Sequence, residues 1–325
     1  MNIFLRTFNP HINSKTGAPL PAGKTRGTPE WLIFQQLLMD CIESLGHKLS
    51  TANEGGLNEK PFPMYGDRII LCHRTRRDEE AHLYWIQMHM RELFTIDPNG
   101  WGYDHSRRQE FPPHLIDAET ARHFCQEKSD QFLASGVSKH DQPTQTGMTP
   151  PRFILVPIQI PRDYTIKHHS PITVKYFVDS IQAWAIETEN HVCFKLHPCN
   201  TLDMDIINAV SHAADNSRYV HQVEGNIHEL IKRSSGLFVI NSGTGFESLI
   251  HGKPVATFGN CDYNAATFNA DIRRLDEARN FLYSYNDSLR DVAYRYVYWY
   301  WKELAYDVYD AETPARLKKY LEGVL

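Results

Sequence analysis

The sequence predicts an α/β protein made of two Rossmann-like, doubly wound domains with a C-terminal helical tail. Its 325 residues are 42% hydrophobic and 22% charged, which suits one large or two ordinary domains with full cores. Strand-like and helix-like segments alternate, as in proteins with parallel sheets. The alternation stops at a stretch rich in proline and glycine and then restarts. We therefore expect a first domain over 1–134, a linker over 135–151, a second domain over 152–287 and the tail over 288–325.

The first domain begins with a strand-like segment, Asn2–Phe8. Thr28 and Pro29 are typical of a helix start, and apolar residues at helical spacing follow them. Next we expect a strand over 68–73, a charged helix over 78–91 and a strand over 93–96.

The second domain begins with the apolar run 153–160, which predicts a buried strand. Further strands are expected at 191–196, 219–223, 237–240 and 254–258, with helices at 171–188, 203–214 and 227–232. In the tail, Tyr294, Tyr298, Trp301 and Ala305 share one helix face. Burial of that face, with the tail returning to the first domain, is the expected use.

Composition narrows the classes of function. The net charge of −5 offers no basic stripe, which disfavours nucleic-acid binding. Six scattered cysteines and no secretory segment favour a cytoplasmic protein, with the inner face of the membrane as the alternative. No apolar run reaches the roughly 20 residues of a membrane span, although peripheral contact is left open. Several arginines also leave nucleic acid open as a partner: Arg74, Arg76, Arg77, Arg107 and Arg108.

A hydroxyl-rich and glycine-rich loop follows the predicted strand 237–240 and leads into a short helix. Free N–H groups at a helix N-terminus hold anions, most often phosphates. Glu247, in the first turn, is placed to accept hydrogen bonds from a ribose. An ordinary turn with glycines for packing is an equally weighted interpretation. The loop comprises Asn241, Ser242, Gly243, Thr244 and Gly245.

Two further strand ends carry polar residues. Lys195 and His197 end the strand 191–196, just before Pro198, and could bind or protonate a departing phosphate. Gln159 and Asp163 follow the strand 153–160. A cap on the next turn is the structural alternative for Asp163.

In the first domain, the loop 96–106 has a composition suited to sugars, because aromatic rings stack on pyranoses and carboxylates bind hydroxyls or exchange protons. A tight Asp-Pro-Asn-Gly turn is the alternative. Its candidate residues are Asp97, Trp101, Tyr103, Asp104 and His105.

Two other patterns predict no function. The segment Gly17–Thr25 resembles a phosphate-binding P-loop but has the wrong spacing and two prolines. No histidine or cysteine pattern has metal-ligand spacing, so we expect neither a metal nor a cofactor.

Three motifs together resemble the capsule polysaccharide biosynthesis family, which includes bacterial β-Kdo glycosyltransferases that use CMP-Kdo. They are Q-x-x-x-D at 159–163, K-x-H-P at 195–198 and N-S-x-x-G-x-E-x-x-x-x-G-K-P-V at 241–255. The likeness extends over about 152–265 and includes Tyr263. It implies a GT-B fold, in which two Rossmann-like domains face each other across a cleft, with the nucleotide donor on the second.

The resemblance also implies residue roles. His197, Ser242 and Thr244 would contact the donor phosphate, and Asp163 matches the nucleophile proposed for retaining members. The acidic motif of the first domain is represented only by Asp97 and the residues after it.

The favoured function is a metal-independent glycosyltransferase that moves Kdo or a related acid from a CMP-activated donor to a glycan or glycolipid. One alternative is a GT-B enzyme acting on a UDP-sugar or glycosylating a modified nucleic-acid base. The other is a non-catalytic sugar-binding subunit of a polysaccharide assembly complex.

Overall fold

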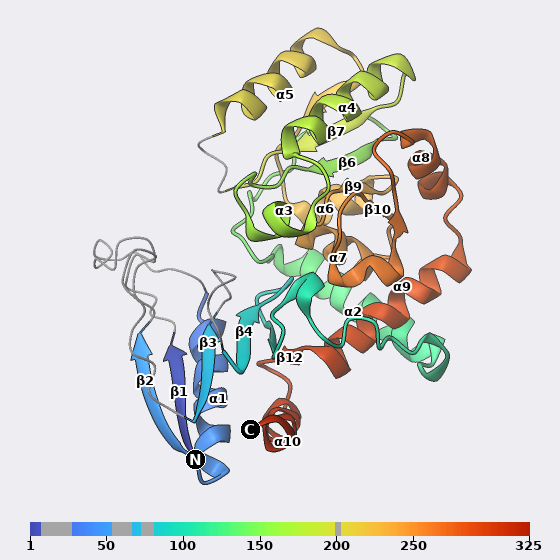
Figure 1. The fold of residues 1–325 in the computed structure, drawn as a ribbon. Helices are drawn as coiled ribbons and strands as arrows, with labels where there is room; N and C mark the ends of the chain where they lie inside the picture. Colours follow the sequence, from blue (N-terminus) through green and yellow to red (C-terminus); the bar gives the residue numbers. More distant parts are fainter. Residues whose placement is uncertain (8–27, 54–66, 73–80, 199–202) are drawn as a thin grey trace. The chain divides into compact units, whose positions relative to one another are not determined.

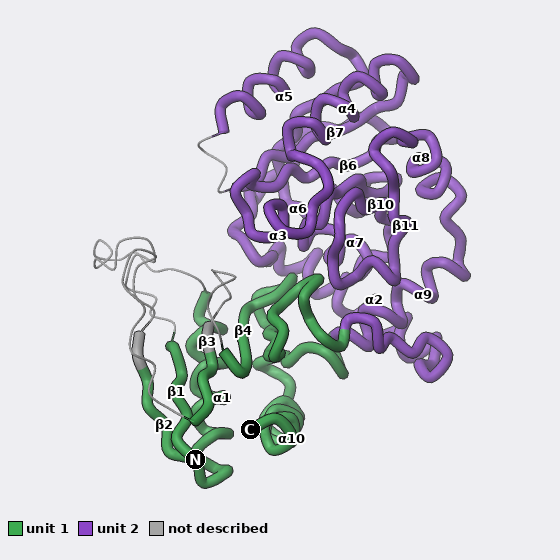
Figure 2. Tube along the Cα trace, viewed as in Figure 1, with its two compact units in different colours: residues 1–107, 301–325 green, residues 108–300 purple. Residues whose placement is uncertain are grey.

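The computed structural model describes residues 1–7, 28–53, 67–72, 81–198 and 203–325. The chain forms two compact units, each of which combines helices with a six-stranded sheet (Figures 1 and 2). Unit 1 comprises residues 1–107 and 301–325, and unit 2 comprises residues 108–300. The predicted class, two α/β domains with a helical C-terminal region, is confirmed.

Unit 1 has a sheet of order β12-β5-β4-β3-β1-β2. The pairs β1–β2, β1–β3 and β3–β4 are parallel, whereas β5 is antiparallel to both β4 and β12. The strands are β1 (Asn2–Thr7), β2 (Lys48–Asn53), β3 (Arg68–Cys72), β4 (Leu83–Gln87), β5 (Leu93–Asp97) and β12 (Tyr306–Asp307).

The helix expected over 78–91 is wrong, because its described part contains the strand β4. All five residues of β4 are buried, and Leu83–Ile86 form an apolar run that suits a central strand. Met88 N–H donates to the carbonyl of Leu93 at 2.8 Å and so closes a tight turn into β5. The charged residues that suggested a helix only flank this strand.

Helix α1 (Glu30–Ser44) begins directly after Pro29, as the sequence predicts, and packs against α10 (Thr313–Val324). Its buried face carries Trp31 and Phe34. The Phe34 ring stacks on Phe94 of β5, with ring centroids 4.6 Å apart. Such aromatic pairs bury large areas and hold the helix against the sheet.

Unit 2 has an entirely parallel sheet of order β11-β10-β9-β6-β7-β8. Counted along this unit, the strand order is 6-5-4-1-2-3, which is the Rossmann order. The strands are β6 (Ile154–Pro157), β7 (Val192–Lys195), β8 (Val220–Gln222), β9 (Leu237–Val239), β10 (Val255–Thr257) and β11 (Phe268–Asn269).

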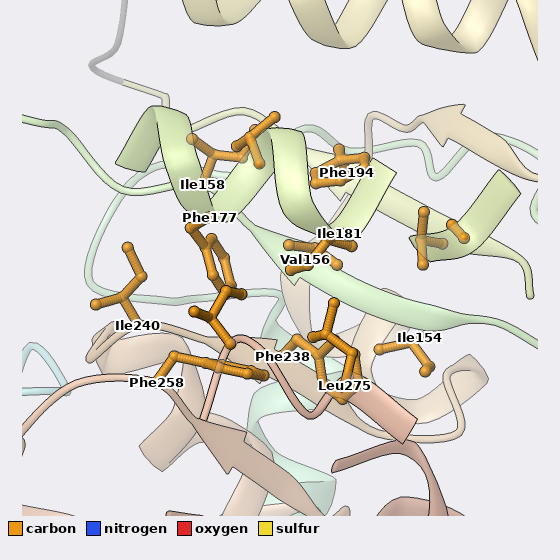
Figure 3. Packing of buried hydrophobic residues seen from close by; sticks show 14 of the residues in the cluster. Ile154, Val156, Ile158, Phe177, Ile181, Phe194, Phe238, Ile240, Phe258 and Leu275 are labelled. Carbon is orange, nitrogen blue, oxygen red and sulfur yellow. The ribbon is translucent and has the colours of Figure 1, made fainter. Parts of the chain in front are cut away.

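One face of this sheet is covered by α4 (Val174–Glu187), α5 (Met204–Asn216) and α8 (Leu275–Tyr283), whose apolar residues form one core with the strands (Figure 3). Phe177 of α4, for example, packs on Phe258, with centroids 5.3 Å apart. Helix α7 packs against β9 and β10. It also contacts α2, α6 and α9. The remaining helices of unit 2 are α2 (Ala118–Ser135), α3 (Tyr164–His169), α6 (Ile227–Arg233), α7 (Gly243–Ile250) and α9 (Asp287–Trp299).

The units divide the chain at other positions than the sequence predicts. Helix α2 lies almost wholly in the stretch expected to end the first domain at residue 134, but it packs on α7 and α9 and belongs to unit 2. The expected linker 135–151 is also bound to unit 2, because Thr146 Oγ1 accepts from Asn226 N at 3.0 Å and Gly147 N donates to Glu224 O at 3.1 Å. Proline and glycine content identified a segment without regular structure, but not where its hydrogen bonds go.

The tail is shared between the units. Helix α9 belongs to unit 2, whereas residues 301–325 complete unit 1 through β12 and α10. Tyr294, Trp301 and Ala305 of the aromatic stripe are buried, as expected, whereas Tyr298 is half-buried. Among the described helices, none combines the length and the apolar character needed to cross a membrane.

Candidate functional site

The strand order of unit 2 reverses between β6 and β9, where connections leave in opposite directions. In open α/β sheets, ligands bind beyond the carboxyl ends of the strands at such a switch point. Gln159 and Asp163 follow β6, and Asn241 and Ser242 follow β9. His197 follows β7, the neighbour of β6 on the other side. The topology thus brings the three predicted motifs to one edge of one sheet.

The loop after β9 presents the N-terminus of α7. Ser242 is the N-cap, and its Oγ accepts from Thr244 N at 3.3 Å. Tyr263, which is fully buried, donates its hydroxyl proton to the carbonyl of Ser242. A Cβ on Gly245 would lie 2.5 Å from that hydroxyl, so glycine is needed for this close approach. Tyr263, which the sequence predicted to bind the nucleotide-sugar donor, holds the loop through its hydrogen bond to the Ser242 carbonyl.

Gln159 and Asn241 form a reciprocal pair. The Gln159 amide donates to Asn241 Oδ1 at 2.9 Å and accepts from Asn241 N at 3.0 Å. Asn241 Nδ2 also donates to the carbonyl of Thr165 at 3.0 Å. Both side chains are buried. These two predicted donor-binding residues connect the loops after β6 and β9 and set the entry to α7.

Lys195 ends β7 and is 8% exposed as a residue, whereas Pro198, three residues later, is exposed. Burial lowers the pKa of the Lys195 ammonium, and Glu247 and Glu224 oppose this effect. Burial also lowers the pKa of His197, helped by the nearby lysines and opposed by Asp163. The imidazole of His197 is therefore mainly neutral at pH 7.

Asp163 is exposed and caps α3, accepting from Thr165 N at 3.2 Å. This is the structural alternative considered for it. The carboxylate nevertheless lies close enough to His197 and Lys139 to oppose the lowering of both pKa values by burial. Asp163 thus caps α3 and also lies beside Lys139 and His197.

Three residues of this site were not singled out in the sequence: Ser138, Lys139 and His140, in the expected linker. Ser138 Oγ donates to Glu247 Oε1 at 2.5 Å, and the rings of His140 and His197 are edge-to-face, 4.8 Å apart. Burial lowers the pKa of Lys139 to about 8, against the opposing effects of Asp163 and Glu247. The sequence signal was a polar Ser-Lys-His run that begins two positions after a helix-ending glycine.

Glu247 is only 4% exposed and lies within electrostatic reach of both Lys139 and Lys195. One buried carboxylate therefore serves two ammonium groups and a serine hydroxyl. The structure gives Glu247 this internal role, and its contact with a ribose stays a prediction.

The predicted residues of the first domain lie in unit 1, in the loop after β5. Asp97 is 1% exposed, and its carboxylate accepts from Asn99 N at 2.8 Å and from the backbone N and Oγ of Ser106. This arrangement makes Asp97 the anchor of the loop and does not present it as an accessible acid. His105 is also buried, whereas Trp101, Tyr103 and Asp104 are half-buried.

Other expectations concern arginines and metal ligands. Arg74, Arg76, Arg77 and the segment Gly17–Thr25 lie outside the described residues. Arg107 donates to the carbonyl of Glu303 at 3.3 Å within unit 1. In the part of the chain that the structure describes, no three His, Cys, Asp or Glu side chains are grouped as metal ligands.

A Rossmann-like unit with a polar edge at its switch point, together with a second α/β unit, corresponds to the predicted GT-B fold class. A model of the family described as capsule polysaccharide biosynthesis protein matches residues 107–309, more than half of the chain. The chain therefore belongs to this family, as its motifs predicted.

Solved structures with a similar course of the chain include two from Thermosulfurimonas dismutans. KpsC, beta Kdo 2,7 transferase, is 17% identical with a TM-score of 0.49 over 81% of this chain and 86% of its own. KpsC, beta Kdo 2,4 transferase, is 14% identical with a TM-score of 0.48 over 80% of this chain and 87% of its own. A UDP-GlcNAc 2-epimerase of Methanocaldococcus jannaschii is 9% identical with a TM-score of 0.42 over 99% of each chain. Comparison with curated proteins gave no significant match.

Proposed function

We propose that this protein is a glycosyltransferase that binds the phosphate of a nucleotide-activated sugar at the carboxyl edge of the unit 2 sheet. The observation that carries the proposal is the grouping of Lys195, His197 and Lys139 beside Glu247 of α7. Ammonium groups stabilise the negative charge that develops on a departing phosphate, and free N–H groups at a helix start add to this. Membership of a capsule polysaccharide biosynthesis family supports a sugar as the transferred group.

The donor we propose is CMP-linked Kdo or a related acid, and the acceptor a glycan or glycolipid. The support is the resemblance of the three motifs, which all lie in unit 2. Because the positive charge comes from lysines, we propose that transfer needs no metal ion.

The proposed chemistry is a retaining double displacement. An Asp163 carboxylate oxygen forms a bond to the anomeric carbon as the bond from that carbon to the phosphate oxygen breaks, and CMP leaves with the electron pair. Neutral His197 donates an N–H hydrogen bond to the departing phosphate. An acceptor hydroxyl then displaces the carboxylate, loses its proton to water and restores Asp163.

The test compares Asp163→Ala with Asp117→Ala. Asp117 is also an exposed N-cap in unit 2, accepting from Thr120 N at 2.8 Å at the start of α2, so both changes remove one cap. Asp163→Ala should abolish transfer and leave CMP binding intact, whereas Asp117→Ala should transfer normally. Denaturing mass spectrometry of wild type with CMP-Kdo alone should find one sugar on the peptide that contains Asp163. Near wild-type transfer by Asp163→Ala would exclude the covalent route.

A further inference from the structure

The segment 136–140, between α2 and β6, is fixed to unit 2 at several points. The carbonyl of Gly136 accepts from Asn226 Nδ2 at 2.9 Å, and the carbonyl of Val137 from His228 Nε2 at 2.8 Å. Ser138 is anchored to Glu247, and the ring of His140 lies against His197. Lys139 thus stands between two anchored neighbours, so its backbone is held beside α7 and the end of β7.

A chain of buried side chains holds this segment from the inside. Ser129 Oγ lies 2.7 Å from His251 Nδ1, and His251 Nε2 lies 2.9 Å from His228 Nδ1. The Val137 carbonyl can only accept, so His228 Nε2 carries a proton. His251 then donates to His228 and accepts from Ser129, so each ring nitrogen and the hydroxyl in this network has a partner. Such networks hold one conformation when all members have partners.

The electrostatics of Lys139 favour an anion beside it. Its charged and titratable surroundings are Asp163 at the start of α3, Glu247 of α7, and His197 after β7. Lys195, at the end of β7, interacts with the same Glu247. Glu247 is shared with Lys195, and Asp163 is exposed, so these carboxylates offset the burial of the ammonium only in part. A phosphate that binds at the start of α7 would lie beside this ammonium group and interact favourably with it.

We infer that Lys139 is a donor-binding residue that contacts the phosphate of the nucleotide. This inference rests on the proposed function. It adds to that site a phosphate-binding residue that none of the three motifs contains. The chemistry it recognises is a nucleoside monophosphate group, independent of the base.

The first experiment measures binding of CMP and of cytidine to the full chain by calorimetry. Lys139→Met should weaken CMP binding by roughly 10- to 100-fold, the value of a charge-assisted hydrogen bond, and leave cytidine binding unchanged. Lys175→Met is the control, because it removes an exposed ammonium of α4 that pairs with Asp179. It should bind both ligands like wild type.

The second experiment follows CMP affinity between pH 7 and 9.5, where the phosphate stays a dianion because its second pKa is near 6. The pKa of Lys139 is about 8, so affinity should fall about tenfold from pH 7 to 9 as the ammonium loses its proton. Lys139→Arg stays charged and should lose the fall centred near pH 8, whereas Lys195→Arg should retain it. A merely structural lysine would not shift this profile.

The outcomes separate the inference from the proposed function. If UMP, GMP or AMP binds in place of CMP and loses affinity in Lys139→Met, the donor assignment fails and the role of Lys139 stands. If Lys139→Met weakens cytidine and CMP equally, or no nucleotide or inorganic phosphate binds in a Lys139-dependent way, the inference is overturned.

Discussion

The hydroxyl of Ser138 donates a hydrogen bond to the carboxylate of Glu247, across 109 positions of sequence. The bond joins a segment without regular structure to the first turns of α7. It supplies a donor to a carboxylate that burial would otherwise leave costly. This hydrogen bond therefore links the segment 136–140 to α7.

Ser138→Ala should lower the free energy of unfolding by about 1 to 3 kcal/mol, because a buried charged acceptor loses a donor. Urea titration measures this change. Ser284→Ala, at an exposed position, should change it by less than about 0.5 kcal/mol. Equal stability of both variants would show that Glu247 finds another donor.

Gly245→Ala should disturb the loop that caps α7. The added methyl group would meet the Tyr263 hydroxyl at 2.5 Å and push it from the Ser242 carbonyl. We expect a lower melting temperature and weaker CMP binding. Gly323→Ala is the matched control, since a Cβ there meets nothing within 4 Å in helix α10. It should keep or slightly raise stability.

His251 should make the protein sensitive to mild acid. Burial, reinforced by His228, lowers its pKa to about 3 from an ordinary value of 6.5. Below pH 6.5 the imidazole of His251 is protonated in the unfolded chain, whereas in the folded chain it stays neutral until the pH approaches 3. The free energy of unfolding should therefore fall as pH drops from 6.5 towards 3, by up to about 1.4 kcal/mol per pH unit.

Urea titrations of wild type and His251→Gln at pH 7, 6 and 5 test this expectation. His251→Gln should be less stable at pH 7 and show a shallower pH slope. His123→Gln, in which an exposed histidine of α2 is replaced, should keep the wild-type slope. An unchanged slope in His251→Gln would assign the acid sensitivity to other groups.

His197→Ala should lower kcat for transfer by roughly 10²- to 10³-fold, the usual cost of one lost transition-state hydrogen bond. The melting temperature should change little, because the ring is only half-buried. Steady-state kinetics and a thermal melt on the same preparation provide the readouts. Loss of folding would favour a structural role in packing against His140.

Asp97→Ala should destabilise unit 1 without altering CMP binding to unit 2. The change removes the acceptor that holds Asn99 and Ser106 in the loop after β5. A lowered melting temperature with normal CMP affinity is expected, and calorimetry with a thermal melt checks both. A fully stable variant with lost transfer would instead support the catalytic role that the sequence suggests.

The sequence predicted the edge of unit 2 well because each motif follows an apolar strand within a few positions. A strand end and the polar residue after it are local features, so Asp163, His197 and Ser242 could be placed on one sheet edge. The parallel topology then follows from the alternation of strands and helices.

Lys139 could not be found in this way. Its place depends on hydrogen bonds that its neighbours Ser138 and Val137 form with Glu247 and His228, both far along the chain. Composition described the segment only as a linker. The strand β4 was missed for a related reason, because flanking charges outweighed a short apolar run that is buried by its neighbours in the sheet.

Unit 1 is built from two separate stretches of the chain, 1–107 and 301–325. During synthesis from the N-terminus, β5 therefore emerges long before β12, its edge partner. At about 5 to 20 residues per second, the delay is roughly 10 to 40 seconds. Unit 2 is continuous and is synthesised in full before β12, so the part of the protein that begins first is the last to be completed.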